Sequence, residues 1–140
     1  MDTMVWKVVR VFSGGWRYSV NGERRLTYER DVWVEPPRGR LFAFKDVTSA
    51  RRFLKLFQEG QPLASLELWE AQAEDVRPQP TMLLGIYLAD ERLVQRFWSG
   101  DLRPDDTTST PPGTVSCSRL RLLQVVNPQE PEGRVLVFRA

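Results

Sequence analysis

The segment Leu41–Gly60 constrains the fold more than any other part of the chain, because it predicts a strand, a turn and a helix in direct succession. Its first four residues, Leu41–Phe44, are apolar, too few for a helix and preceded by turn residues at 36–39, so we expect a short buried strand. Asp46 predicts the start of the helix, since its carboxylate can accept from the free N–H groups of a first turn. Gly60 predicts its end, because glycine readily adopts the left-handed conformation that follows a last turn.

The apolar residues of the predicted helix recur at steps of three and four residues, which places them on one face. They are Val47, Ala50, Phe53, Leu54 and Phe57. Three basic residues, Arg51, Arg52 and Lys55, fall away from this stripe, where we expect solvent. The helix therefore packs on a sheet by one side and presents positive charge on the other.

Most of the remaining chain predicts short strands separated by turn residues. The predicted strands lie at 5–12, 16–20, 26–28, 32–34, 66–73, 82–88, 114–126 and 135–138. A second helix follows Asp90, which caps it, and ends before Gly100. Polar turn formers predict a loop at 77–80 and a mobile loop at 101–113.

These elements predict a single α+β domain over residues 1–140. We expect a mostly antiparallel sheet of about seven or eight short strands, with two amphipathic helices packed on it. Within it, residues 16–28 predict a hairpin closed by the three-residue loop Val20–Gly22, which places Tyr18 opposite Arg24. That register puts the apolar residues of both strands on one face, whereas a two-residue loop would set Arg25 opposite Tyr18 and separate them.

The residue types that are missing exclude many mechanisms. The chain has no histidine and one cysteine, Cys117, which excludes Ser-His and Cys-His catalytic pairs, iron–sulfur clusters and the common zinc sites. No phosphate-binding glycine loop is present either. Cys117 lies in a strand-like segment and is expected to be a small buried residue. We therefore expect a non-enzymatic protein with no cofactor and no metal, in the cytoplasm and without a membrane span.

Charge is spread unevenly along the chain. Residues 1–58 hold twelve Lys and Arg against six Asp and Glu, whereas residues 59–109 hold four against ten. A duplex-binding domain usually has a basic footprint without such an acidic block, so direct sequence-specific nucleic-acid binding is not expected. A bipolar surface of this kind favours docking on a protein.

Two groups of residues are candidates for that docking surface. Tryptophan and arginine dominate interface hot spots, and both occur near the tip of the predicted hairpin. The first candidates are Trp16, Arg17, Tyr18, Arg24 and Arg25. The second candidates are Arg51, Arg52 and Lys55 on the first predicted helix.

In overall character the chain resembles small phage-encoded host-takeover proteins that bind bacterial RNA polymerase. The likeness lies in its 140-residue length, its missing catalytic residues, its seventeen arginines against three lysines and its α+β make-up. The resemblance implies a protein that acts without catalysis in the host cytoplasm. Such a protein docks on the polymerase or its sigma factor and alters transcription.

Two other functions fit the same residues. A viral nucleotide-binding or nucleotide-sequestering protein would use Arg24, Arg25 and Arg38 beside aromatic faces to hold phosphate and base. An accessory or structural virion protein would instead assemble with copies of itself.

Overall fold

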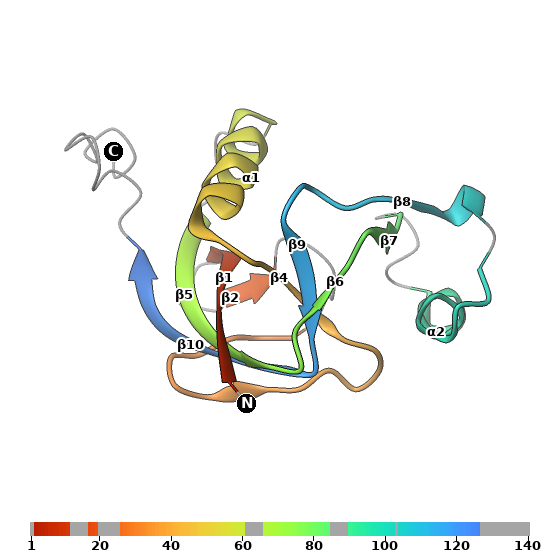
Figure 1. The fold of residues 1–140 in the computed structure, drawn as a ribbon, viewed down its shortest axis with the longest axis horizontal. Helices are drawn as coiled ribbons and strands as arrows, with labels where there is room; N and C mark the ends of the chain where they lie inside the picture. The colour runs from red at the N-terminus through yellow and green to blue at the C-terminus, as the bar shows by residue number, and fades with distance from the viewer. Residues whose placement is uncertain are drawn as a thin grey trace.

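A computed structural model describes residues 2–11, 17–19, 26–60, 66–84, 90–102 and 104–126. These residues form one eight-stranded sheet, a separate two-stranded ribbon and two α-helices (Figure 1). Every pairing between two named strands is antiparallel. The predicted α+β fold is therefore confirmed.

The sheet is built around β1, its longest strand. Its members are β1 (Asp2–Val11), β2 (Arg17–Ser19), β3 (Trp33–Val34), β4 (Leu41–Phe44), β5 (Leu66–Glu74), β6 (Arg77–Pro78), β9 (Thr114–Cys117) and β10 (Arg119–Val126). Their order is β3-β10-β5-β1-β4-β9-β6, and β2 pairs with β1 on the edge that β4 also uses. β5 pairs with β1 at nine positions, from Asp2 opposite Glu74 to Arg10 opposite Leu66.

One face of the sheet curls around the main core. Val5 and Val9 of β1 pack there with Trp69, Ala71 and Ala73 of β5, as the alternation of a strand requires. Strands that are far apart in the strand order of the sheet contribute to the same cluster. β10 contributes Leu120 and Leu122, and β9 contributes Val115 and Cys117. The sheet must therefore be strongly curved, as Figure 1 shows.

Lys7 is the exception in this apolar alternation, because its side chain is fully buried between Val5 and Val9. Its Nζ donates to the carbonyl oxygen of Phe42 and lies 5.3 Å from the centre of the Tyr28 ring. A buried ammonium group needs such acceptors and aromatic faces, since water is excluded.

The helix α1 (Val47–Gly60) packs on the other face of the sheet. Ala50 and Leu54 are buried there against Val8, Phe44 and Leu68. At its start the Ser49 N–H donates to Asp46 Oδ1 over 2.7 Å, which confirms the predicted cap. Gly60, expected just beyond the helix, is its last residue.

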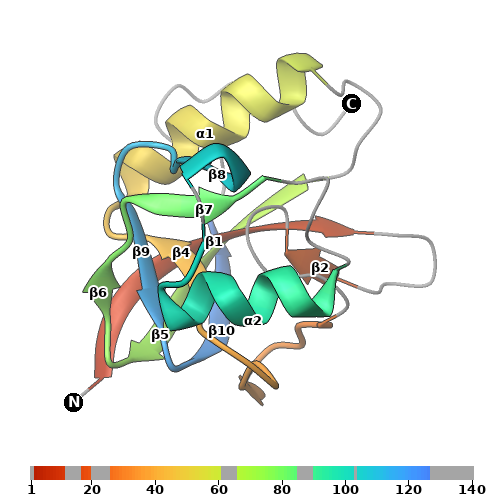
Figure 2. The same cartoon turned by 90° about the vertical axis from the view of Figure 1, so that its right-hand side faces the viewer.

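The ribbon consists of β7 (Thr81–Leu83) and β8 (Thr107–Ser109) and continues the β6–β9 pair outward. Between the last β6–β9 pair and the first β7–β8 pair, two residues intervene on one strand and five on the other. The extra residues form a bend that contains Pro111, Pro112 and Gly113. In Figure 2 the ribbon runs in roughly the same direction as α1, and Figure 1 shows it set apart from the helix, beyond β9.

The second helix, α2 (Glu91–Ser99), lies between the two ribbon strands in sequence. Asp90 accepts from the N–H groups of Arg92 and Leu93, and Gly100 ends the helix with a φ of 76°, as predicted for both. Trp98 packs edge-on against Phe42, with 5.7 Å between the ring centres.

Three sequence predictions about loops and strands are wrong. The expected loop at 77–80 contains β6, which pairs with β9, and the expected mobile loop at 101–113 contains a 3-10 turn (Pro104–Asp106) and β8. The single strand expected at 114–126 is two strands separated at Ser118. In each case pairing with a distant strand, which local composition does not reveal, decides the outcome.

The predicted hairpin register is also wrong. Tyr18 lies opposite Thr27 rather than Arg24. The assumption that both apolar sets share a face fails because Tyr28 turns into the main core, while Tyr18 is half-buried. The predicted loop 20–22, most of the segment 82–88 and the strand at 135–138 lie outside the described residues.

Gly113 is expected to hold the ribbon against α1. An added Cβ there would lie 2.5 Å from Ser49 Cβ, and the residue has a φ of 85°, whereas Gly100 has a φ of 76° with nothing within 4 Å. Gly100→Ala should therefore lower the free energy of unfolding by about 1–2 kcal/mol through backbone strain alone. Gly113→Ala should cost about 1–3 kcal/mol more, because the clash with α1 adds to the strain. Urea denaturation of both variants measures the difference, and equal losses would contradict the close approach.

Candidate functional site

The first predicted docking surface lies only partly within the described residues. Arg17 Nε donates to Glu67 Oε1 over 2.8 Å, and the guanidinium lies 5.2 Å from the centre of the Trp69 ring. These contacts tie β2 to β5 across β1, so Arg17 serves the fold. Tyr18 is half-buried. The other three candidates, Trp16, Arg24 and Arg25, lie outside the described residues.

The second predicted surface is divided by the geometry of the helix. Because a helix turns about 100° per residue, Arg51 and Arg52 point to different sides of α1. Arg52 is exposed and lines a groove beside the helix, and Lys55 is exposed near it in sequence. Arg51 is half-buried and does not line that groove.

The groove lies between α1 and the ribbon with its bend, and we call it the α1–ribbon groove. Its volume is about 480 Å³. The α1 wall consists of Ser49, Arg52, Phe53, Leu56 and Phe57. The opposite wall consists of Met82, Ser109, Thr110, Pro111 and Pro112.

The chemistry of this groove is mainly apolar, with one charged side chain. Phe53 and Phe57 stack with 5.8 Å between their ring centres, and Phe53 also packs against the core under α1. Leu56 remains 64% exposed. Among the described residues that line the groove, Arg52 is the one with a charged side chain. An apolar concave surface with one cation suits a hydrophobic side chain whose neighbours are polar or acidic.

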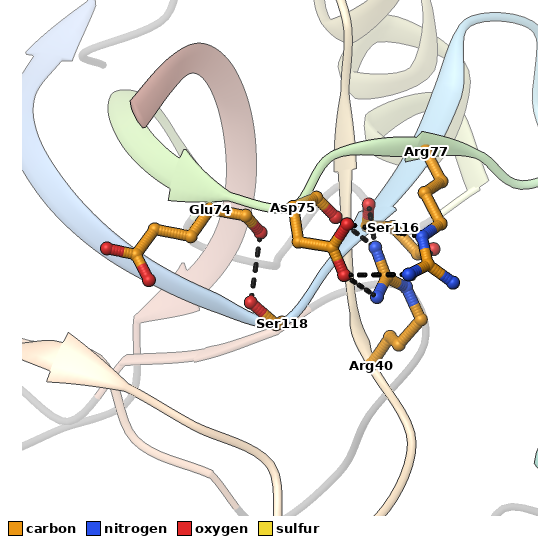
Figure 3. A network of polar contacts seen from close by, with 6 residues as sticks. All are labelled: Arg40, Glu74, Asp75, Arg77, Ser116 and Ser118. Carbon is orange, nitrogen blue, oxygen red and sulfur yellow. Dashed lines mark hydrogen bonds and ion pairs between the residues drawn. The ribbon is translucent and has the colours of Figure 1, made fainter. Parts of the chain in front are cut away.

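A dense polar network lies where β5 turns into β6 (Figure 3). Arg40 Nη1 donates to Asp75 Oδ2 over 2.9 Å and Arg40 Nε to Ser116 Oγ over 2.8 Å, while Arg77 Nη2 reaches the same Asp75 oxygen over 3.0 Å. The Arg40 guanidinium, then that of Arg77, holds the pKa of the Asp75 carboxyl below its usual value, against the opposing effect of partial desolvation. Asp75 has a φ of 56°, so these contacts also secure a left-handed turn residue.

A neighbouring ion pair joins β5 to β10. Both guanidinium nitrogens Nε and Nη2 of Arg119 donate to the carboxylate of Glu74 over 2.7 Å. This pair lowers the pKa of Glu74 and raises that of Arg119. The same guanidinium lies 4.1 Å from the centre of the Trp33 ring. In both networks the charged groups are bonded to one another across strands, which indicates a structural role.

The described residues offer little for other kinds of site. Among them, no group of three or more His, Cys, Asp or Glu residues is placed to hold a metal ion, and no helix is long and apolar enough to cross a membrane. Arg38, expected in a nucleotide site, donates to Gln95 Oε1 over 2.9 Å. Cys117 is buried, as predicted.

Three comparisons with known proteins identified no relative of this chain. The chain matches no family model, no curated protein and no solved structure.

Sequence reasoning missed most of the α1–ribbon groove. Its ribbon wall, with Met82 and Pro111, depends on the pairing of β7 with β8, which connects residues far apart in the chain. One signal was present in the sequence: Leu56 is apolar but lies outside the predicted stripe of α1. A large apolar residue on the side of a helix expected to face solvent indicates a second contact.

The Arg40–Asp75 pair should make the free energy of unfolding decrease as the pH is lowered. Because the pKa of Asp75 is lowered by folding, its ionised form stabilises the fold above its unfolded-state pKa, and this contribution is lost as pH falls through the lower folded-state pKa. A double-mutant cycle with Arg40→Gln and Asp75→Asn should therefore give a favourable coupling at pH 7 that declines below about pH 4. Urea denaturation across this pH range measures the coupling, and a coupling that does not change with pH would refute the assignment.

Proposed function

We propose that this chain is a non-enzymatic regulator that binds a protein partner through the α1–ribbon groove. The observation that carries the proposal is Leu56, which is 64% exposed in the α1 wall of the groove and extends its apolar surface beyond Phe53 and Phe57. An isolated exposed leucine needs no explanation, but one that extends an aromatic cluster into a groove is typical of an interface anchor.

The charge around the groove supports a protein partner as well. Arg52 lines it, and Lys55 and Lys45 are exposed on and before the same helix. Positive charge beside an apolar surface guides a negatively charged partner toward it and fixes its orientation.

The partner we propose is bacterial RNA polymerase or its sigma factor. The support is the resemblance in overall character to phage-encoded host-takeover proteins, which work without catalysis and by docking. In this function the chain acts in the host cytoplasm, where it alters transcription by occupying a polymerase surface. The nucleotide-binding alternative has weaker support, because Arg38 already donates to Gln95.

Purified bacterial RNA polymerase holoenzyme should bind the intact chain, and Leu56→Asp should weaken that binding at least about tenfold, since a buried hot-spot side chain contributes about 2 kcal/mol or more. Biolayer interferometry with immobilised chain measures both affinities.

Val32→Asp is the matched control, because Val32 is also an exposed apolar residue, at 47%, and does not line the groove. This variant should bind the polymerase like the wild-type chain. The proposal fails if the holoenzyme does not bind, or if both variants lose binding equally.

A further inference from the structure

We infer that the α1–ribbon groove receives an amphipathic segment of the partner that carries acidic side chains beside an apolar anchor. The inference rests on the proposed protein-binding function and specifies the chemistry of the docking element. It follows from the shape, the apolar lining and the charge of the groove.

The shape of the groove suits a short helical or extended segment. Its α1 wall runs from Ser49 to Phe57, which is about 12 Å along the helix at 1.5 Å per residue. That length matches about two turns of a partner helix, enough for anchors at positions i, i+3 or i+4 and i+7. The opposite wall is held in place by the bend at Gly113, where the backbone approaches Ser49 closely.

The lining requires an apolar anchor. Leu56 lines the groove beside Phe53 and Phe57, whose rings stack on each other, and Met82 and Pro112 belong to the opposite wall. Removing these groups from water on binding is favourable only if the side chains that cover them are themselves apolar. Methionine adapts its shape to different partners, so this wall tolerates some variation in the anchor.

The charge of the rim selects against a basic segment and for an acidic one. Residues 47–57 contain no aspartate or glutamate, and the two exposed basic side chains among them are Arg52 and Lys55. The nearest carboxylate in sequence, that of Asp46, accepts from the Ser49 N–H. Hydrogen bonds from the backbone and then the side chain of Ser49 hold the pKa of Asp46 below its usual value, and Lys45 and Arg52 lower it further as positive neighbours, so this carboxylate stays ionised at the helix cap. Arg52 in the lining is the positive charge that carboxylates of a bound segment would meet, and the exposed Lys55 lies about one turn further along the same helix.

Two designed amphipathic peptides of equal length test this chemistry. Both carry leucine and phenylalanine at the same positions, and their polar positions are filled with glutamate in one and lysine in the other. Fluorescence anisotropy of labelled peptides with the full chain should show about tenfold or greater preference for the glutamate peptide, declining at high salt. Leu56→Asp should abolish binding of the glutamate peptide.

Arg52→Gln and Arg51→Gln form a matched pair, because both remove one arginine charge from α1 but only Arg52 lines the groove. Arg52→Gln should reduce the preference for the glutamate peptide several-fold, and Arg51→Gln should leave it unchanged. Equal binding of the two peptides, binding of neither, or equal effects of the two substitutions would overturn the inference.

The test separates this inference from the proposed partner. If the chain binds the glutamate peptide but does not bind RNA polymerase, the docking chemistry is supported and the polymerase assignment is refuted. Polymerase binding that the glutamate peptide does not displace refutes the docking chemistry alone. Dimerisation of the chain that Leu56→Asp abolishes would show a second copy as the occupant and overturn the inference.

Discussion

The packing of α1 on the sheet is the contact on which the rest of the structure depends. Ala50 and Leu54 bury one side of the helix against β1, β4 and β5, and this contact fixes where every other side of α1 points. The apolar arc of the helix is wider than the sheet can cover, since Phe53 and Phe57 lie at its edge and Leu56 beyond it. The uncovered part of that arc becomes one wall of the α1–ribbon groove.

The second wall has its own anchors, which are independent of the first. The base of the ribbon is held by Asp75 between Arg40 and Arg77, and its bend is held at Gly113 against the start of α1. Fully exposed ion pairs of this kind contribute little to stability. Here they also satisfy the polar groups of a turn that has a left-handed residue. The groove is therefore formed by two separately supported elements, as expected of a preorganised binding surface.

Local signals predicted the parts of this structure that local chemistry determines. Both helices and their caps at Asp46 and Asp90 were predicted, because cap and stripe residues lie within a few positions of each other. The ribbon was mistaken for a loop, since its polar strand becomes a strand only by pairing with β7. The hairpin register failed at Tyr28, whose burial depends on strands far away in the chain. The same difference holds for the candidate site. Arg52 was predicted from the local pattern of the helix, whereas the ribbon wall opposite it depends on long-range strand pairing and was not predicted.

The α1–ribbon groove is the surface that we propose contacts the partner. Hydrogen–deuterium exchange of the chain, alone and with RNA polymerase holoenzyme, tests it most directly, because the backbone amides report contact without any substitution. The account predicts slower exchange on binding in two separate segments, residues 49–57 of α1 and residues 107–114 around the bend, with little change in β3 and β10. Protection confined to β3 and β10, around Trp33 and Arg119, would contradict it and place the interface on the other side of the sheet.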